Sequence, residues 1–239
     1  MRHFYRILVL IFLLYLLCCI SAATYVTETV DEELENRVRR NNDLQLLTSE
    51  PDKDVICCFD VDVRGWIALG FQHGDNKTIC IYNERMEFQY GYVFSYNSDF
   101  GVFWDNGRIV IHYVRSDLGE VYDENGTLLE VYRIPNNAEN AAHWDLVLHD
   151  SKRVVNACTY ECCDDSFFQG LFNNGYSRLY VTDARGNRSL LYDAAKEGTN
   201  SAWRTVAWIN GGLLFAGINT WAIITKAKQN RAGETTKES

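Results

Sequence analysis

The sequence has few residues that break regular structure and few basic side chains. Only 2 of its 239 residues are proline and 47% are apolar, so a disordered polar chain is excluded and one globular core is expected. Its 23 basic residues stand against 32 acidic ones, which gives a formal charge of −9. A large phosphate-neutralising surface is therefore excluded, and we expect no nucleic acid partner.

Motifs for catalysis and for cofactors are also missing. The five histidines do not have metalloprotease spacing, and neither a Gly-x-Ser-x-Gly elbow nor a phosphate-binding glycine loop occurs. No aspartate cluster has the complete oxygen pattern of a calcium loop. The sequence thus predicts no catalytic residue, no cofactor and no metal ligand, and it favours a protein that is not an enzyme.

A long uncharged run lies near the N-terminus, within residues 1–23. The stretch from Ile7 to Ile20 is almost purely apolar, with two arginines before it and three small residues after it. This is the pattern of a secretory signal peptide. Residues 7–23 would span roughly 25 Å as a helix, so a retained signal anchor is the second interpretation. Both interpretations export the chain that follows.

A second uncharged run lies near the C-terminus. The twenty residues from Thr205 to Ile224 carry no charge, which predicts a transmembrane helix within residues 204–225. Trp203 and Trp221 stand near its ends, where indole rings favour the membrane interface. The alternative is a buried helix of a soluble core. Residues 226–239 contain a cluster of Lys and Arg and are predicted to form a basic cytoplasmic tail.

The charges around the two runs agree on one topology. We expect a two-pass protein of the cell membrane with both termini cytoplasmic and the central domain extracytoplasmic. Residues 24–203 contain 16 basic and 30 acidic side chains, a formal charge of −14. Anionic lipid surfaces and polyanions should not attract this part.

Residues 24–54 form an acidic segment without the aromatic density of the rest. Val30, Leu34 and Val38 are four apart, which places them on one face of a helix. We expect a partly helical juxtamembrane linker. A coiled pairing stem is the alternative, but it would need several heptads of apolar positions.

Residues 55–203 are rich in Val, Ile, Tyr, Phe and Trp separated by turn residues, which predicts a mainly β domain. The expected strands follow one another about every ten residues. They are Val55–Val61, Trp66–Gln72, Thr78–Tyr82, Phe88–Phe94, Gly101–Trp104, Ile109–Val114, Gly119–Tyr122 and Leu128–Ile134.

The β-rich region also repeats with a period of about 40 residues. Asp62 and the strand after it correspond to Asp105 and its following strand, and Tyr82 corresponds to Tyr122. Residues 180–192 form a partial third copy. The period predicts blade-like repeats of four antiparallel strands, in an open propeller-like or sandwich-like body flanked by two transmembrane helices. The less regular residues 136–177 would mix strand with short helix and cover exposed edges.

Six cysteines fall in the exported region, an even number that invites disulfides outside the cytoplasm. They are Cys57, Cys58, Cys80, Cys158, Cys162 and Cys163. We expect at least one bridge that joins the trio at 158–163 to itself or to the first repeat. Zinc binding by the trio and inert buried thiols are the alternatives. Strand alternation would put Cys57 and Cys58 on opposite faces.

Several short phrases resemble a family of uncharacterised two-pass membrane proteins from clostridia-like bacteria. The resemblance spans roughly residues 56–193 and rests on four phrases: Cys58–Val61, Lys77–Tyr82, Phe88–Tyr92 and Tyr113–Asp117. It implies a bacterial membrane protein with an extracytoplasmic β-rich domain. It carries no functional residues over to this chain.

Two functional hypotheses follow from these observations. The first is a membrane-tethered extracytoplasmic binding or scaffold module that takes a protein partner or a surface ligand. The alternative is a membrane-bound hydrolase, which requires distant polar side chains to converge in one pocket. The candidates for that pocket are Asp60, Asp62, His112 and His149.

Overall fold

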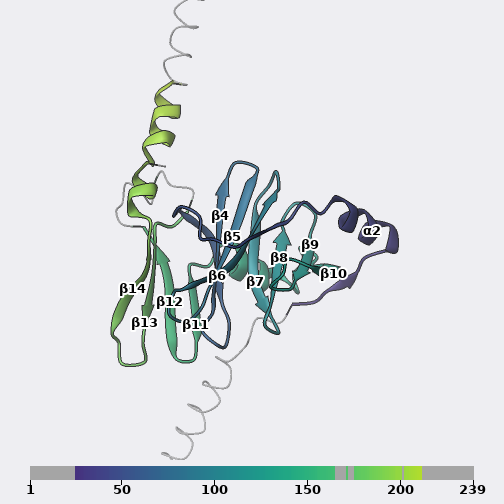
Figure 1. The fold of residues 1–239 in the computed structure, drawn as a ribbon, viewed down its shortest axis with the longest axis horizontal. Helices are drawn as coiled ribbons and strands as arrows, with labels where there is room; N and C mark the ends of the chain where they lie inside the picture. The colour runs from purple at the N-terminus through teal and green to yellow at the C-terminus, as the bar shows by residue number, and fades with distance from the viewer. Residues whose placement is uncertain (1–24, 165–170, 172–174, 201, 212–239) are drawn as a thin grey trace, which may run out of the picture.

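The structure is a computed structural model that describes residues 25–164, 171, 175–200 and 202–211. Within these residues the fold is mainly β, with three antiparallel sheets of four or five strands and few helices (Figure 1). The core of each sheet is four strands that are consecutive in the chain, each paired with the next. A run of four short strands with tight turns is what the alternation of β-branched and turn residues predicts.

The first sheet has the order β2-β6-β5-β4-β3. Its strands are β2 (Gln45–Leu47), β3 (Ile56–Val61), β4 (Ile67–His73), β5 (Asn76–Tyr82) and β6 (Phe88–Ser95). The second sheet has the order β1-β10-β9-β8-β7. Its strands are β1 (Glu28–Thr29), β7 (Phe100–Asp105), β8 (Arg108–Tyr113), β9 (Leu118–Tyr122) and β10 (Leu128–Arg133).

The third sheet has the order β11-β12-β13-β14. Its strands are β11 (Lys152–Val155), β12 (Cys158–Cys163), β13 (Arg178–Thr182) and β14 (Arg188–Asp193). All eight strands expected between residues 55 and 134 are confirmed, with ends shifted by one or two residues. The partial third copy corresponds to β13, β14 and the turn between them.

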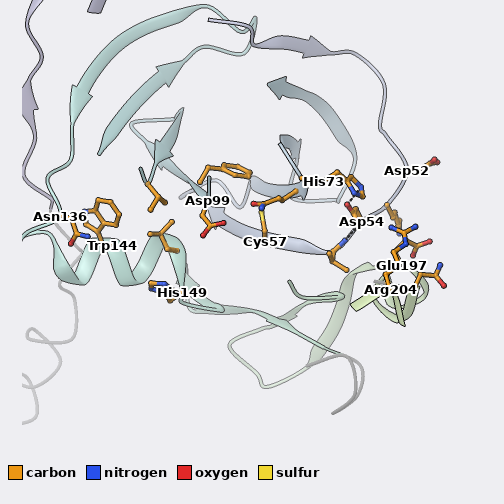
Figure 2. Close-up of a pocket in the computed structure, with 18 residues that line it drawn as sticks. Asp52, Asp54, Cys57, His73, Asp99, Asn136, Trp144, His149, Glu197 and Arg204 are labelled. Carbon is orange, nitrogen blue, oxygen red and sulfur yellow. Dashed lines mark hydrogen bonds and ion pairs between the residues drawn. The ribbon is translucent and has the colours of Figure 1, made fainter. Parts of the chain in front are cut away.

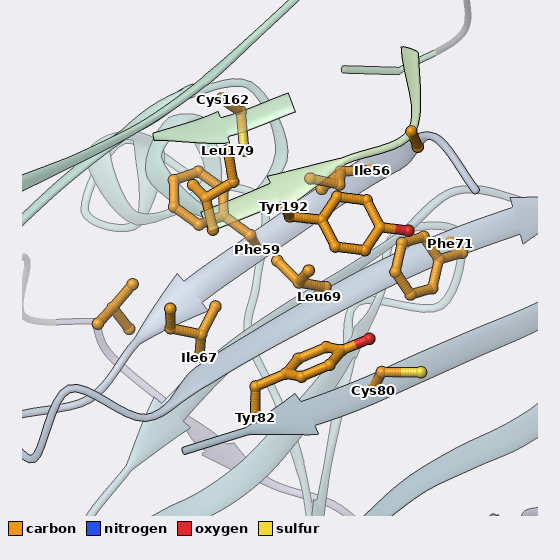
Figure 3. Packing of buried hydrophobic residues seen from close by; sticks show 12 residues of the cluster. Ile56, Phe59, Ile67, Leu69, Phe71, Cys80, Tyr82, Cys162, Leu179 and Tyr192 are labelled. Carbon is orange, nitrogen blue, oxygen red and sulfur yellow. The ribbon is translucent and has the colours of Figure 1, made fainter. Parts of the chain in front are cut away.

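The first sheet is buried on both faces. One face packs against the third sheet, where Leu179 and Tyr192 lie over Leu69 and Phe71 (Figure 3). The other face packs against the second sheet through a cluster that includes Ile79 and Phe100. Burial on both sides explains why β4 reads as a continuous apolar run rather than an alternating one.

One kind of turn recurs at four hairpin tips. At each tip an Asp or Asn side chain accepts hydrogen bonds from the backbone N–H groups two and four residues later. The residue three positions after the Asp or Asn has a positive φ. The four loops are Asp62–Trp66, Asn83–Glu87, Asp123–Thr127 and Asp183–Asn187. The Asp105 hairpin differs, because its two central residues, Asn106 and Gly107, both have positive φ.

Residues 24–54 contain more regular structure than a linker. Within the described part, β1 and β2 extend two of the sheets, and helix α2 (Glu32–Asn41) connects them. Asp31 caps the helix by accepting from the Leu34 N–H at 2.7 Å, and three glutamates lie in its first turn. Arg39 donates to the carbonyl oxygen of Leu128, which fixes α2 to the second sheet.

Helix α3 (Ala141–Leu148) lies in the region that was expected to mix strand and helix, and it packs on β7 and β3. It buries His143, Trp144 and Val147. Tyr25 packs against the buried side of α3, where its ring stacks on that of His143 with the two ring centroids 4.4 Å apart. Tyr25 is partly buried and packs against the core cluster of the second sheet.

The predicted first membrane segment lies outside the described residues, as does most of the second. Residues 195–200 and 202–211 are helical and include the beginning of the second uncharged run. Among the residues that the structure describes, no helix combines the length and the apolarity that crossing a membrane requires.

Candidate functional site

A cleft of about 790 Å³ lies where β3, β4 and β7 meet α3 and the helical residues after 195. Its floor is apolar and is formed by Val55, Cys57, Phe100, Trp144 and Leu148. Figure 2 shows Trp144 on α3 and His149 just after α3 at one end, Glu197 and Arg204 at the other, and Cys57 between them. The volume is in the range of a site for a small molecule or a short peptide segment.

The rim of the cleft carries charges of both signs. Four carboxylates line it together with two cationic side chains and two histidines. They are Asp52, Asp54, Asp99 and Glu197; Lys53 and Arg204; and His73 and His149. Polar groups make up slightly more of the exposed lining than apolar ones, so the floor supplies some burial and the charged rim would fix the orientation of a ligand.

His73 and Asp54 form a close side-chain contact on this rim. His73 lies at the end of β4, and its Nε2 is 2.5 Å from an Asp54 carboxylate oxygen (Figure 2). The two residues face each other because β3 and β4 are antiparallel, with Ile56 opposite Phe71. The other Asp54 oxygen accepts from the Val55 N–H at 2.8 Å. One Asp54 oxygen is therefore held by the backbone, and the other lies beside the exposed imidazole at the mouth of the cleft.

A buried lysine lies behind the same wall. Lys77 on β5 is 1% exposed, and its Nζ donates to the carbonyl oxygen of Gly74 at 2.6 Å. Burial lowers the pKa of Lys77, while the nearby charges of Cys57, Asp99 and Asp75 raise it.

The two candidate catalytic aspartates have structural roles away from the cleft. Asp60 accepts hydrogen bonds from Arg153 on β11 and from the Trp104 N–H on β7. Burial raises its pKa, and Arg153 opposes that shift. Asp62 caps the first hairpin tip by accepting from the backbone N–H groups of Arg64 and Trp66, both at 2.8 Å.

The two candidate histidines are also apart from each other. His112 on β8 is fully buried, and its ring packs edge-on against Trp144 with centroids 4.4 Å apart. Burial lowers its pKa to about 3, and burial likewise lowers that of neighbouring His143 to about 4. His149 is exposed at the end of α3. Of the four side chains proposed for a hydrolase, only His149 lines the cleft.

Metal binding has no support in the described part of the chain. There, no three His, Cys, Asp or Glu side chains come together as a ligand set. The trio considered for zinc lies along a single strand, β12, and Cys162 belongs to the buried cluster between the first and third sheets. Cys80 belongs to the same cluster (Figure 3).

All six cysteines between residues 57 and 163 are free thiols in the structure. Strand β12 places Cys158 and Cys162 four residues apart in extended backbone, which corresponds to about 13 Å between their Cα atoms. A disulfide spans roughly 4.4 to 6.8 Å, so a bridge from Cys158 to Cys162 or Cys163 would require β12 to break. A bridge from the trio to the first sheet stays a prediction.

The expectation that Cys57 and Cys58 point to opposite faces is wrong. The register of β3 against β4 shifts between Ile56 and Cys58, which is a β-bulge. A bulge inserts one extra residue, so the strict alternation of side chains fails there. The two sulfur atoms are 3.8 Å apart, and both side chains pack toward the second sheet.

Sequence reasoning missed most residues of the cleft. Asp54, His73 and Asp99 lie at strand ends or in loops, and nothing in their spacing brings them together. The one available indication was the antiparallel pairing of the first two expected strands, which sets Asp54 opposite His73 once the register is known.

No protein-family model matches the chain, and a search of curated proteins finds no similar sequence.

Proposed function

We propose that the protein is a membrane-tethered extracytoplasmic binding module whose cleft takes a short polypeptide segment of a protein partner. The observation that carries this proposal is the cleft of about 790 Å³ with an apolar floor and a rim of mixed charge. Its floor would bury an apolar side chain, and its rim would pair with the charged groups beside that side chain.

We further propose that the three sheets act as blades of an open, propeller-like body. The first strands of the three sheets support this arrangement, since β3 contacts both β7 and β11. Propeller blades also bring their first strands together near a common axis. A cleft at the start of β3 would then lie between blades, where loops from several sheets contribute.

The membrane attachment is part of the same proposal. The uncharged run from Thr205 begins inside the helical residues 202–211, where Trp203 is 60% and Trp208 is 83% exposed. Exposed indole rings at the start of an apolar helix favour a membrane interface. The first run would supply a signal anchor, and the acidic domain would lie outside the cytoplasm.

Site-specific photo-cross-linking in membranes of cells that produce the full chain tests the binding proposal. A photoreactive amino acid at Asn136, on the rim, should give an adduct with one reproducible partner peptide identified by mass spectrometry. The matched control is the same amino acid at Arg185, at the exposed tip of the β13–β14 hairpin.

The Asn136 adduct should disappear when Asp99→Lys reverses a rim charge, because the partner would lose its charge complement. Equal adducts at Asn136 and Arg185, or no adduct at Asn136, would overturn the assignment of the cleft as the binding site.

A further inference from the structure

We propose that Cys57 and Cys58 form a redox-active dithiol that closes to a disulfide between adjacent residues in the floor of the cleft. The two sulfur atoms are already 3.8 Å apart and share one face of β3. Neighbouring cysteines of a regular strand point to opposite faces, so this approach depends on the bulge between Ile56 and Cys58.

The two thiols have different access to solvent. Cys57 is half-buried and lines the cleft, whereas Cys58 is 6% exposed. The Cys58 sulfur lies over Gly70 on β4, where an added Cβ would overlap it. Cys57 is therefore the thiol that a small disulfide reaches first, and Cys58 is held beside it as the resolving thiol.

The reaction needs only a small-molecule disulfide as oxidant. The Cys57 thiolate attacks one sulfur of the oxidant, which forms a mixed disulfide and releases one small thiolate. Burial raises the pKa of the Cys58 thiol, so its proton passes to the departing small thiolate as the Cys58 sulfur attacks the Cys57 sulfur and releases the second small thiol. Two cysteine thiols are oxidised to one disulfide, and the oxidant is reduced to two thiols.

The bridge would be a reducible one. Adjacent Cα atoms are about 3.8 Å apart, less than the roughly 4.4 Å at which ordinary disulfides begin, so the closed ring is strained and more easily reduced. Closure would also draw the Cys57 sulfur toward Cys58 and change the floor of the cleft. This proposal does not depend on the membrane topology or on a ligand.

The chain contains a matched control pair. Cys162 and Cys163 are also adjacent, but they lie in β12 where the register with β13 continues without a shift. Cys162 is 2% exposed in the core, and Cys163 lies 3.8 Å from an Arg188 nitrogen. Alternation therefore keeps these two thiols on opposite faces, and they should not bridge.

The test uses the full chain in a mild detergent, equilibrated in buffers of oxidised and reduced glutathione. The protein is then acid-quenched, alkylated, digested and analysed by mass spectrometry. We expect the peptide with Cys57 and Cys58 to lose the mass of two hydrogen atoms and to escape alkylation, while Cys162 and Cys163 remain alkylated. In the Cys58→Ser variant, Cys57 should instead retain one glutathione, because no resolving thiol remains.

Several results would overturn the proposal. One is full alkylation of both Cys57 and Cys58 under oxidising conditions in which Cys58→Ser takes up glutathione. Another is a bridge from Cys57 to any cysteine other than Cys58. Equal bridging at Cys162 and Cys163 would show that adjacency alone suffices and that the bulge has no role. Matching thermal unfolding of Cys58→Ser and the parent verifies that the variant is folded.

Discussion

The Arg153 side chain on β11 donates a hydrogen bond of 2.9 Å to the carboxylate of Asp60 on β3, which lies 93 residues earlier in the chain. The other oxygen of that carboxylate accepts from the Trp104 N–H on β7 at 2.8 Å. The Asp60 side chain of the first sheet therefore bonds to β11 of the third sheet and to β7 of the second sheet. Arg153 also donates to the carbonyl oxygens of Phe59 and Leu146, which ties α3 to the same point.

Removal of the guanidinium should destabilise the whole domain. In Arg153→Met the carboxylate of Asp60 would stay buried without its partner, so we expect a loss of about 3 to 5 kcal/mol in the free energy of unfolding. Urea unfolding followed by tryptophan fluorescence measures this loss. The double variant Asp60→Leu/Arg153→Met should lose less than the single change, because no unpaired charge remains.

The exposed pair of Arg188 and Glu161 is the control for that experiment. It joins β14 to β12 at 3.3 Å, and its side chains are 49% and 31% exposed. Arg188→Met should therefore lower the free energy of unfolding by roughly 1 kcal/mol or less. Equal losses for Arg153→Met and Arg188→Met would contradict the central role of Arg153.

The stability of the domain should fall in mild acid. His112 and His143 have pKa values lowered to about 3 and about 4 by burial, below the 6.5 of an exposed histidine. Their contribution to the free energy of unfolding is fully present above pH 6.5. It is lost as the pH falls toward 4, because the histidines of the unfolded chain bind protons at a higher pH than those of the folded chain. At pH 5 each histidine should cost on the order of 2 kcal/mol.

The variant His112→Leu should flatten this pH dependence. Neither ring nitrogen of His112 has a hydrogen-bond partner among the described residues, so an apolar side chain of similar volume should keep the stability at pH 7. Urea unfolding at a series of pH values gives the comparison. His149→Gln, at an exposed position of α3, should leave the profile of the parent unchanged, and a parallel flattening there would refute the assignment.

The close contact between β7 and α3 leaves no room for a side chain at Gly101. A Cβ at this position would overlap Val147 Cγ1 and come within 3.1 Å of Leu148 Cδ2. We expect Gly101→Ala to cost about 1 to 3 kcal/mol through overpacking. Gly211→Ala lies in a helix where no atom of the described residues is within 4 Å of the added methyl, so this change should be neutral or slightly stabilising. Thermal unfolding of both variants decides between these outcomes.

The proposed topology is tested with a tag after Ser239. Protease added outside intact cells should leave the tag uncut, because the basic residues from Lys226 to Arg231 favour a cytoplasmic C-terminus. Cleavage of the tag while cytoplasmic marker proteins survive would mean that the second segment is inverted or does not span the membrane.

The sequence was sufficient to predict the strands between residues 55 and 134 and the turns that join them, but not β1, β2, β11 or β12. The strands from Val55 to Ile134 follow from alternating β-branched and aromatic residues, and the tips at Asp62, Asp123 and Asp183 follow from an Asx residue three positions before a glycine. Both depend on interactions within a few residues of the chain. Interactions between residues that are close in the chain can be predicted directly from the order of the residues.

Tertiary structure alone decided which side chains meet. The pairing of Asp60 with Arg153 depends on how two sheets pack, and the approach of Cys57 to Cys58 depends on a bulge that overrides alternation. The cleft collects residues from 52 to 204, none of them linked by a local pattern. Register and sheet packing are set by the burial of many side chains at once, so no single stretch of sequence contains them.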